Sequence, residues 1–180
     1  MIRSTGRIRV THQGTLPRSE GLRELVRARA AGQQYEPGEV GKQVAQAVKD
    51  VVRRQVEIGI DSVNDGEQGK SSFSDYVAQR LGGLEQTTEP YVSAISGRDR
   101  LDFPNYYARN PMRLARNVHA VTAPITYIGQ SDVQTDIANL KAALDGLNPE
   151  HAYLPAVAPG TIEHWVRTRS TPATRSSCSR

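Results

Sequence analysis

Residues 37–69 read PGEVGKQVAQAVKDVVRRQVEIGIDSVNDGEQG. In the first part of this stretch valine and alanine recur every three or four residues, which is the spacing of one face of an amphipathic helix. Pro37 suits the first turn of that helix, and Gly59 ends it. Ile60 to Val63 then predict a short strand that runs into a polar turn. A helix followed by a strand is the repeating unit of parallel α/β folds, so the stretch indicates that fold class.

The same alternation of strand and helix continues on both sides of this stretch. Further strands are expected at residues 8–10, 118–128 and 152–157, and further helices at 19–30, 74–81 and 131–147. Four alternations predict an α/β chain made of about four parallel βα units. Residues 85–117 contain three prolines and scattered charge, and they predict a long loop, with a hairpin inside it as the alternative to a loop throughout.

The composition predicts a soluble protein with one main domain. The chain has 180 residues, of which 37% are hydrophobic and 6% aromatic, so an aliphatic core is expected. No stretch approaches the roughly 18 apolar residues of a membrane span, and the N-terminus lacks the apolar run of a secretory signal. We therefore expect a cytoplasmic protein without membrane contact. The single cysteine, Cys178, can form neither an internal disulfide nor a thiolate-rich metal site.

The positive charge lies at one end of the chain. Lys and Arg outnumber Asp and Glu by 23 to 19, but residues 166–180 contain four arginines and no acid. The remainder is balanced, which argues against a nucleic-acid partner. The composition of residues 166–180 predicts a disordered basic tail after a folded part at 1–165. The abrupt change at this boundary indicates a frameshift or truncation, and a natural flexible tail is the alternative.

Polar residues follow the expected strands, where parallel α/β folds bind their ligands. They are His12, Gly14, Thr15, Asp65, Glu67, Tyr127, Gln130 and residues 159–161. A carboxylate at Glu67, between glycines, suits a bound ammonium group, and Asp65 could do the same. In the alternative interpretation Asp65 caps a helix and Glu67 is solvated.

The sequence also contains elements of two other kinds of site. Residues 64–71 end in the Gly-Lys-Ser of a phosphate loop, but Asn64 replaces its first glycine and two carboxylates lie where phosphates would bind. This argues against nucleotide binding. His12 suits either a proton carrier or ligand, or a structural residue held by hydrogen bonds.

The motifs that carry these residues resemble the cobalamin-independent methionine synthase family, in particular its shorter bacterial members related to the C-terminal catalytic barrel. The matching segments, in order, are 11–18 (THQGTLPR), 59–69 (GIDSVNDGEQG), 76–83 (YVAQRLGG), 123–127 (APITY) and 154–161 (LPAVAPGT). They are spread over most of residues 7–165.

The resemblance implies a (β/α)8 barrel of the TIM type, of which this chain would form about the first four units. It also implies a transferase of methionine biosynthesis, in which zinc activates the homocysteine thiol for attack on a folate methyl donor (5-methyltetrahydropteroyltriglutamate--homocysteine methyltransferase). Gln13, Gly14 and Thr15 match the segment that holds the homocysteine carboxylate in the family, with Thr15 in place of the usual Ser. Glu67 matches the acid that binds the amino group.

The chain departs from the family at two places. The family's zinc ligands are a His-x-Cys pair, an acid and a later Cys, and we find none of these in this sequence, so catalytic and metal-binding residues stay unassigned. Gln130 stands where full-length synthases have a Trp that stacks on the pterin, which weakens the case for a folate donor. Relatives that alkylate a thiol such as coenzyme M are therefore an alternative.

Two interpretations follow. In the first, the chain is the incomplete N-terminal half of a methionine-synthase-like methyltransferase, with part of the amino-acid site. In the second, it is a non-catalytic half-barrel that binds an amino acid. In either case exposed strand edges predict self-association.

Overall fold

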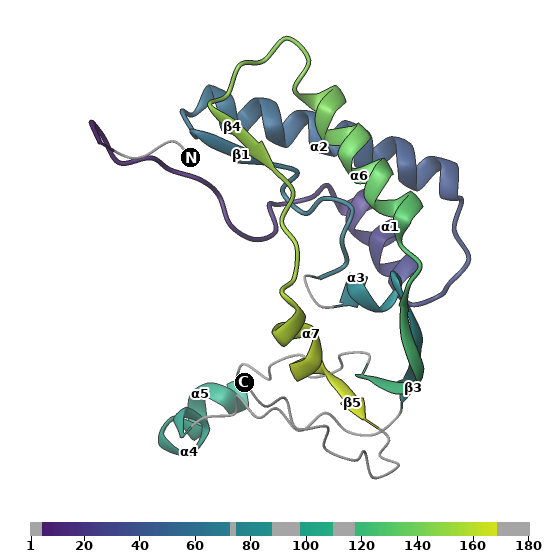
Figure 1. Ribbon diagram of the computed structural model, residues 1–180. Helices are drawn as coiled ribbons and strands as arrows, with labels where there is room; N and C mark the ends of the chain where they lie inside the picture. The colour runs from purple at the N-terminus through teal and green to yellow at the C-terminus, as the bar shows by residue number, and fades with distance from the viewer. Residues whose placement is uncertain (1–4, 73–74, 88–97, 110–117, 169–180) are drawn as a thin grey trace, which may run out of the picture.

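The computed structural model describes residues 5–72, 75–87, 98–109 and 118–168 (Figure 1). The structure is α/β, and three helices form its main layer. These helices are α1 (Glu20–Ala30), α2 (Pro37–Glu57) and α6 (Gln130–Ala143). Both α1 and α6 pack on α2, which is the long helix predicted from the valine spacing.

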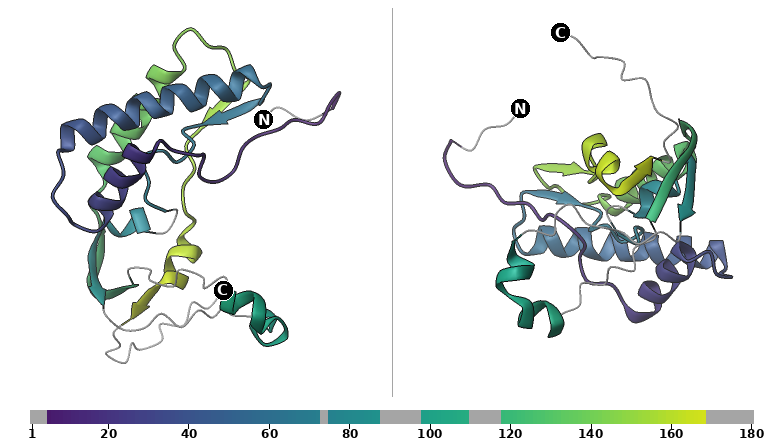
Figure 2. Two further views of the ribbon diagram at one scale, coloured as in Figure 1. Left: turned by 180° about the vertical axis from the view of Figure 1, so that it is seen from behind. Right: turned by 90° about the horizontal axis from the view of Figure 1, so that it is seen from below.

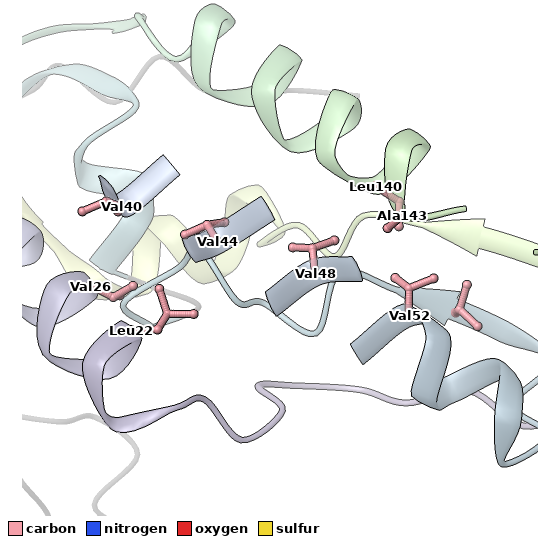
Figure 3. Packing of buried hydrophobic residues seen from close by; sticks show 9 residues of the cluster. Leu22, Val26, Val40, Val44, Val48, Val52, Leu140 and Ala143 are labelled. Carbon is pink, nitrogen blue, oxygen red and sulfur yellow. The ribbon is translucent and has the colours of Figure 1, made fainter. Parts of the chain in front are cut away.

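A stripe of valines on α2 forms the centre of the core. Val40, Val44, Val48 and Val52 follow one another at every fourth residue and are buried. Figure 3 shows this stripe between side chains of α1 and of α6. The complete cluster of buried residues is Leu22, Val26, Val40, Val44, Val48, Val52, Val63, Leu140 and Ala143. These nine described residues are all aliphatic, as expected; of the aromatic residues, Tyr35 packs against the cluster and Tyr76 is buried elsewhere.

Local sequence explains where the first two helices begin and end. The Ser19 hydroxyl caps α1 by accepting a hydrogen bond from the Leu22 N–H at 3.3 Å. Pro37 occupies the first turn of α2, where a missing N–H costs nothing. Gly59 follows the end of α2 with a φ of 83°, a conformation that favours glycine.

Three segments run parallel beside α2. Strand β1 (Ser62–Asn64) pairs with β4 (His151–Tyr153), so that Ser62 lies opposite His151 and Asn64 opposite Tyr153. On the other side of β1, Thr11 forms a parallel bridge to Ser62. Three of the expected strands therefore lie side by side, in the order 10–11, 62–64 and 151–153.

The strand expected at 118–128 belongs to a second sheet. There β3 (Val118–Tyr127) lies between β2 (Leu81–Thr87), to which it is antiparallel, and β5 (Val166–Thr168), to which it is parallel. A bulge between Gly82 and Leu84 needs glycine at 83, because a Cβ there would lie 2.6 Å from the Pro124 carbonyl oxygen.

The prediction of four parallel units is not confirmed, because the described residues align three parallel segments and place the strand at 118–127 in a separate sheet. Alternation of side chains indicates a strand but neither its partner nor its direction, so the pairing of this strand could not be predicted from the sequence. The described residues do not close a barrel.

Four shorter helices complete the described structure. They are α3 (Asp75–Ala78), α4 (Asp99–Asp102), α5 (Pro104–Arg109) and α7 (Pro159–Trp165). Helices α4 and α5 stand apart from the three long helices (Figure 2). They lie inside the loop expected at 85–117, and residues 85–87 belong to β2, so the loop prediction was wrong for residues 85–87, 99–102 and 104–109. Residues 88–97 and 110–117 of the loop lie outside the described residues.

The predicted boundary at residue 165 falls next to β5. Residues 166–168 form this strand, whereas residues 169–180, including Cys178, lie outside the described residues. Within the described part of the chain, no helix is long and apolar enough to cross a membrane.

Candidate binding site

A cavity of about 360 Å³ lies beyond the carboxyl ends of the three parallel segments. Its lining comprises Gln13, Gly14, Thr15, Glu67, Tyr76, Pro155, Ala156, Val157, Ala158 and Thr161. The structure thus brings together the four residues expected to bind substrate, namely Gln13, Gly14, Thr15 and Glu67. They meet because the carboxyl ends of parallel strands lie at the same edge of a sheet.

Glu67 is a buried carboxylate in this cavity, with 5% of its surface exposed. Its φ of 55° is unusual for a residue with a side chain and costs about 1 kcal/mol. Its backbone is held from both sides, since its N–H donates to Asp65 Oδ1 at 3.0 Å and its carbonyl accepts from Arg18 at 2.5 Å.

The Glu67 carboxylate is also oriented. Thr15 Oγ1 donates to Glu67 Oε2 at 2.6 Å. Among the described residues no donor lies on the other oxygen, Oε1. The carboxylate therefore has one oxygen fixed by the protein and one with hydrogen-bonding capacity left for a ligand.

Asn64 anchors the start of the loop that carries Glu67, and it is fully buried. Its Nδ2 donates to the His12 carbonyl at 2.8 Å, and its Oδ1 accepts from the Gly66 N–H at 2.8 Å. The Gln55 side chain pairs with the Asn64 backbone in both directions, at 2.8 and 3.1 Å. Gln55 thus satisfies two buried backbone groups that β1 leaves unpaired.

Asp65 is buried and is not among the residues that line the cavity. Its Oδ2 lies 3.5 Å from Lys70 Nζ, and both residues are about 4% exposed. Burial raises the pKa of Asp65, and the nearby Lys70 ammonium opposes that rise. Its Oδ1 accepts from the Glu67 N–H, so Asp65 supports the turn at residues 66–69 and not the start of a helix. Glu67 is buried, so the alternative interpretation, a helix cap at Asp65 and a solvated Glu67, was wrong.

Lys70 and Tyr76 connect this loop to the opposite wall. Lys70 Nζ donates to the Pro155 carbonyl at 2.7 Å and lies 5.2 Å from the centre of the Tyr76 ring. The Tyr76 hydroxyl accepts from the Val157 N–H at 3.2 Å. Because its ammonium is bound inside the protein, Lys70 is not placed to hold a phosphate, in agreement with the argument against a phosphate loop.

Of the additional candidates, His12 and Gln130 do not line the cavity. His12 Nε2 lies 2.8 Å from the Gly14 carbonyl oxygen, a contact that suits the structural interpretation of this residue. Gln130 is exposed at the first turn of α6, and its amide donates to the Tyr127 carbonyl at 3.3 Å. Neither side chain is brought to Glu67.

Sequence reasoning missed several of the residues that build this site. They are Gln55, Lys70 and Tyr76. Each makes its hydrogen bond to the backbone of a residue on another segment, namely Asn64, Pro155 and Val157 respectively. One signal was present: Gln55 is a polar residue that continues the apolar stripe of α2.

A second cavity, of about 580 Å³, lies between α2 and α6. Tyr76 lines both cavities. Two of the charged groups here are already paired, because Arg80 forms an ion pair with Asp136 at 2.6 Å. The cavity at Glu67, with its open carboxylate oxygen, is therefore the better candidate for a polar ligand.

The described residues contain no group of three or more His, Cys, Asp or Glu side chains that could hold a metal ion. A zinc site needs three or four such ligands. The residues placed by the structure therefore do not fit the zinc that the resemblance implies, and Cys178 lies outside them.

Comparison with known proteins identifies the family. A family model described as "Cobalamin-independent synthase, Catalytic domain" matches residues 9–144. The chain belongs to the cobalamin-independent synthase family. This confirms the resemblance found in the sequence motifs.

Individual relatives agree with this membership. The chain is 26% identical over 149 residues to the 5-methyltetrahydropteroyltriglutamate--homocysteine methyltransferase of Thermotoga petrophila, a match that covers 72% of this chain and 20% of that protein. The chain thus spans about a fifth of the length of that curated relative.

Two solved structures share the fold. One is a B12-independent methionine synthase from Shewanella sp. W3-18-1 in complex with selenomethionine, with a TM-score of 0.51 and 17% identity, covering 78% of this chain and 35% of that one. The other is a putative vitamin-B12-independent methionine synthase from Listeria monocytogenes, with a TM-score of 0.57 and 18% identity, covering 89% and 39%. The α/β fold of the cobalamin-independent synthases is therefore present here.

Proposed function

We propose that this chain binds an α-amino acid of the homocysteine and methionine type, as the amino-acid-binding part of a methyltransferase. The observation that carries the proposal is the buried, oriented Glu67 carboxylate in a cavity that it shares with Gln13, Gly14 and Thr15. Membership of the cobalamin-independent synthases supports the reaction type. The complex of one structural relative with selenomethionine supports the ligand class.

In this proposal Glu67 binds the ammonium group of the amino acid. A hydrogen bond between an ammonium and a carboxylate is about twice as strong as a neutral one, and burial strengthens it further. Glu67 Oε1 would accept this bond, while Thr15 keeps Oε2 in place.

The loop at residues 13–15 binds the carboxylate of the amino acid. The Thr15 hydroxyl already donates its one proton to Glu67, so it is not also free to donate to the ligand. Among the described residues the backbone N–H groups of Gly14 and Thr15 make no hydrogen bond, and Gly14 has a φ of 96°. These N–H groups are therefore the proposed donors.

The proposed reaction is transfer of a methyl group to the thiol of the bound amino acid. The sulfur would form a bond to the methyl carbon while the bond between that carbon and its carrier breaks. The carrier would leave with the electron pair and take up a proton, in balance with the proton that the thiol loses. Zinc would lower the pKa of the thiol, but the described residues do not fit it, so no step is assigned to it here. The contribution proposed for this chain is to hold the two ends of the amino acid. The family match does not identify the methyl donor. It also gives no support to the alternative of a coenzyme M type of thiol alkylation.

Calorimetric titration with L-methionine tests the proposal. Glu67→Gln removes the charge and keeps the size, so the dissociation constant should rise about tenfold or more. Glu24→Gln, at an exposed position of α1, is the matched control and should bind like the wild type. Equal affinity of the Glu67→Gln variant and the wild type would contradict the proposed role of Glu67.

A further inference from the structure

A buried ion pair lies behind Glu67 and connects the two walls of the cavity. One oxygen of Asp65 accepts the Glu67 N–H at 3.0 Å, and the other lies 3.5 Å from Lys70 Nζ. The same Lys70 ammonium donates to the Pro155 carbonyl at 2.7 Å, on the far wall. A continuous chain of polar contacts therefore runs from the backbone of Glu67 to Pro155.

We propose that Asp65 and Lys70 are positioning residues that set the place of the Glu67 carboxylate for recognition of the ligand's ammonium group. This inference rests on the proposed function, since it concerns how Glu67 binds that group. The pair forms a latch, meaning the Asp65–Lys70 ion pair together with its contacts to Glu67 and Pro155.

The left-handed backbone conformation of Glu67 needs contacts that hold it, and the latch supplies them. A left-handed φ at a residue with a side chain persists only where surrounding contacts hold it. Asp65 is the hydrogen-bond partner of the Glu67 N–H, and Lys70 in turn fixes the Asp65 carboxylate. Without the latch, Glu67 could relax to an ordinary backbone conformation and carry its carboxylate away from the cavity.

Stability alone does not account for such a pair. Two buried charges lose their hydration, and apolar residues of similar size usually serve packing equally well. The ammonium also lies over the Tyr76 ring, whose hydroxyl holds Val157 on the same far wall. Both walls are thus fixed relative to each other at the point where the amino acid is proposed to bind.

The latch predicts a specific effect on ligand selectivity. The readout is the ratio of two dissociation constants, that of 4-(methylthio)butanoate, which lacks the α-amino group, to that of L-methionine. The wild type should prefer methionine at least tenfold. In the double variant Asp65→Asn with Lys70→Met, which removes both charges and keeps the sizes, the ratio should fall to about threefold or less. Binding of the compound without the amino group should change less than about twofold.

The control is the ion pair between Arg54 and Glu57, which has the same 3.5 Å separation but lies exposed on α2. Arg54→Met with Glu57→Gln should leave the ratio as in the wild type. The single variant Asp65→Asn keeps an acceptor for the Glu67 N–H, and it should keep more of the preference than the double variant. If the double variant does not melt cooperatively, the same comparison is made with Asp65→Asn and with Lys70→Met separately.

The outcomes separate the two proposals. A wild type that does not prefer methionine overturns the proposed function. A wild type that prefers it, together with folded latch variants that prefer it equally, overturns the latch and leaves the proposed function in place. Equal loss of affinity for both ligands would show that the pair maintains the cavity as a whole, which also overturns the latch.

Discussion

Replacement of Gln55 by leucine should destabilise the chain, because the backbone carbonyl and N–H of Asn64 would lose their hydrogen-bond partner. The Gln55 side chain donates to the Asn64 carbonyl at 2.8 Å and accepts from the Asn64 N–H at 3.1 Å, and Asn64 is fully buried. Leucine keeps the volume but leaves both groups unpaired, at a cost of about 2 kcal/mol each. The greater apolar surface of leucine returns about 1 kcal/mol, so the free energy of unfolding should fall by about 3 kcal/mol.

Urea denaturation measures this loss. At a slope of about 2 kcal/mol per M, the midpoint should move down by about 1.5 M. Gln46→Leu is the matched control, because Gln46 lies exposed on the same helix and makes a single hydrogen bond, to Asp50. This control should change stability by no more than about 0.5 kcal/mol. A folded Gln55→Leu protein whose midpoint matches that of the control would refute the reasoning.

Two further predictions concern acid stability and assembly. The hydrogen bond from Arg7, with one from the Val10 N–H, lowers the pKa of Asp61 from 3.8 to about 2. A lowered pKa in the folded state means that this stabilisation is complete above about pH 4 and is lost as the pH falls towards 2. Melting curves of the wild type and Asp61→Asn should therefore differ above pH 4 and converge near pH 2, and a constant difference would contradict this. Separately, the exposed segment at residues 8–10, with Ile8 86% exposed at the edge of the parallel strands, should make the chain self-associate. Sedimentation velocity should show oligomers that increase with concentration and that Ile8→Lys reduces, whereas a monodisperse wild-type monomer would argue against it.

Periodicity predicted the three long helices α1, α2 and α6 well, because the apolar face of each is a local property of its sequence. The valine spacing of α2 is a property of the helix itself, and its burial against α1 and α6 followed. The strand-end argument similarly predicted that Gln13, Gly14, Thr15 and Glu67 would meet, since parallel strands bring their carboxyl ends to one edge. Their role in binding stays a prediction.

Contacts between distant segments were not predictable in the same way. The strand at 118–127 was recognised, but its partner at 81–87 depends on Gly82 and Gly83, which allow the chains to approach at the bulge. The bond from Lys70 to Pro155 spans 85 residues and leaves no pattern in either segment. Helices α4 and α5 are short and bury no apolar stripe, so no periodicity marked them.

The loop at residues 64–70 is held in place by residues of the described structure, so the proposed amino-acid site can be tested by itself. Buried loops are rare because their backbone groups need partners, and here side chains supply them. Arg18 donates to the carbonyls of Glu67, Gln68 and Lys70, and Arg29 donates to that of Gly69. These contacts, with those of Gln55 and Asp65, hold Glu67 in place using residues within the described structure. Amino-acid recognition at Glu67 is therefore expected to be measurable by binding alone, separately from methyl transfer and from the metal that transfer would require.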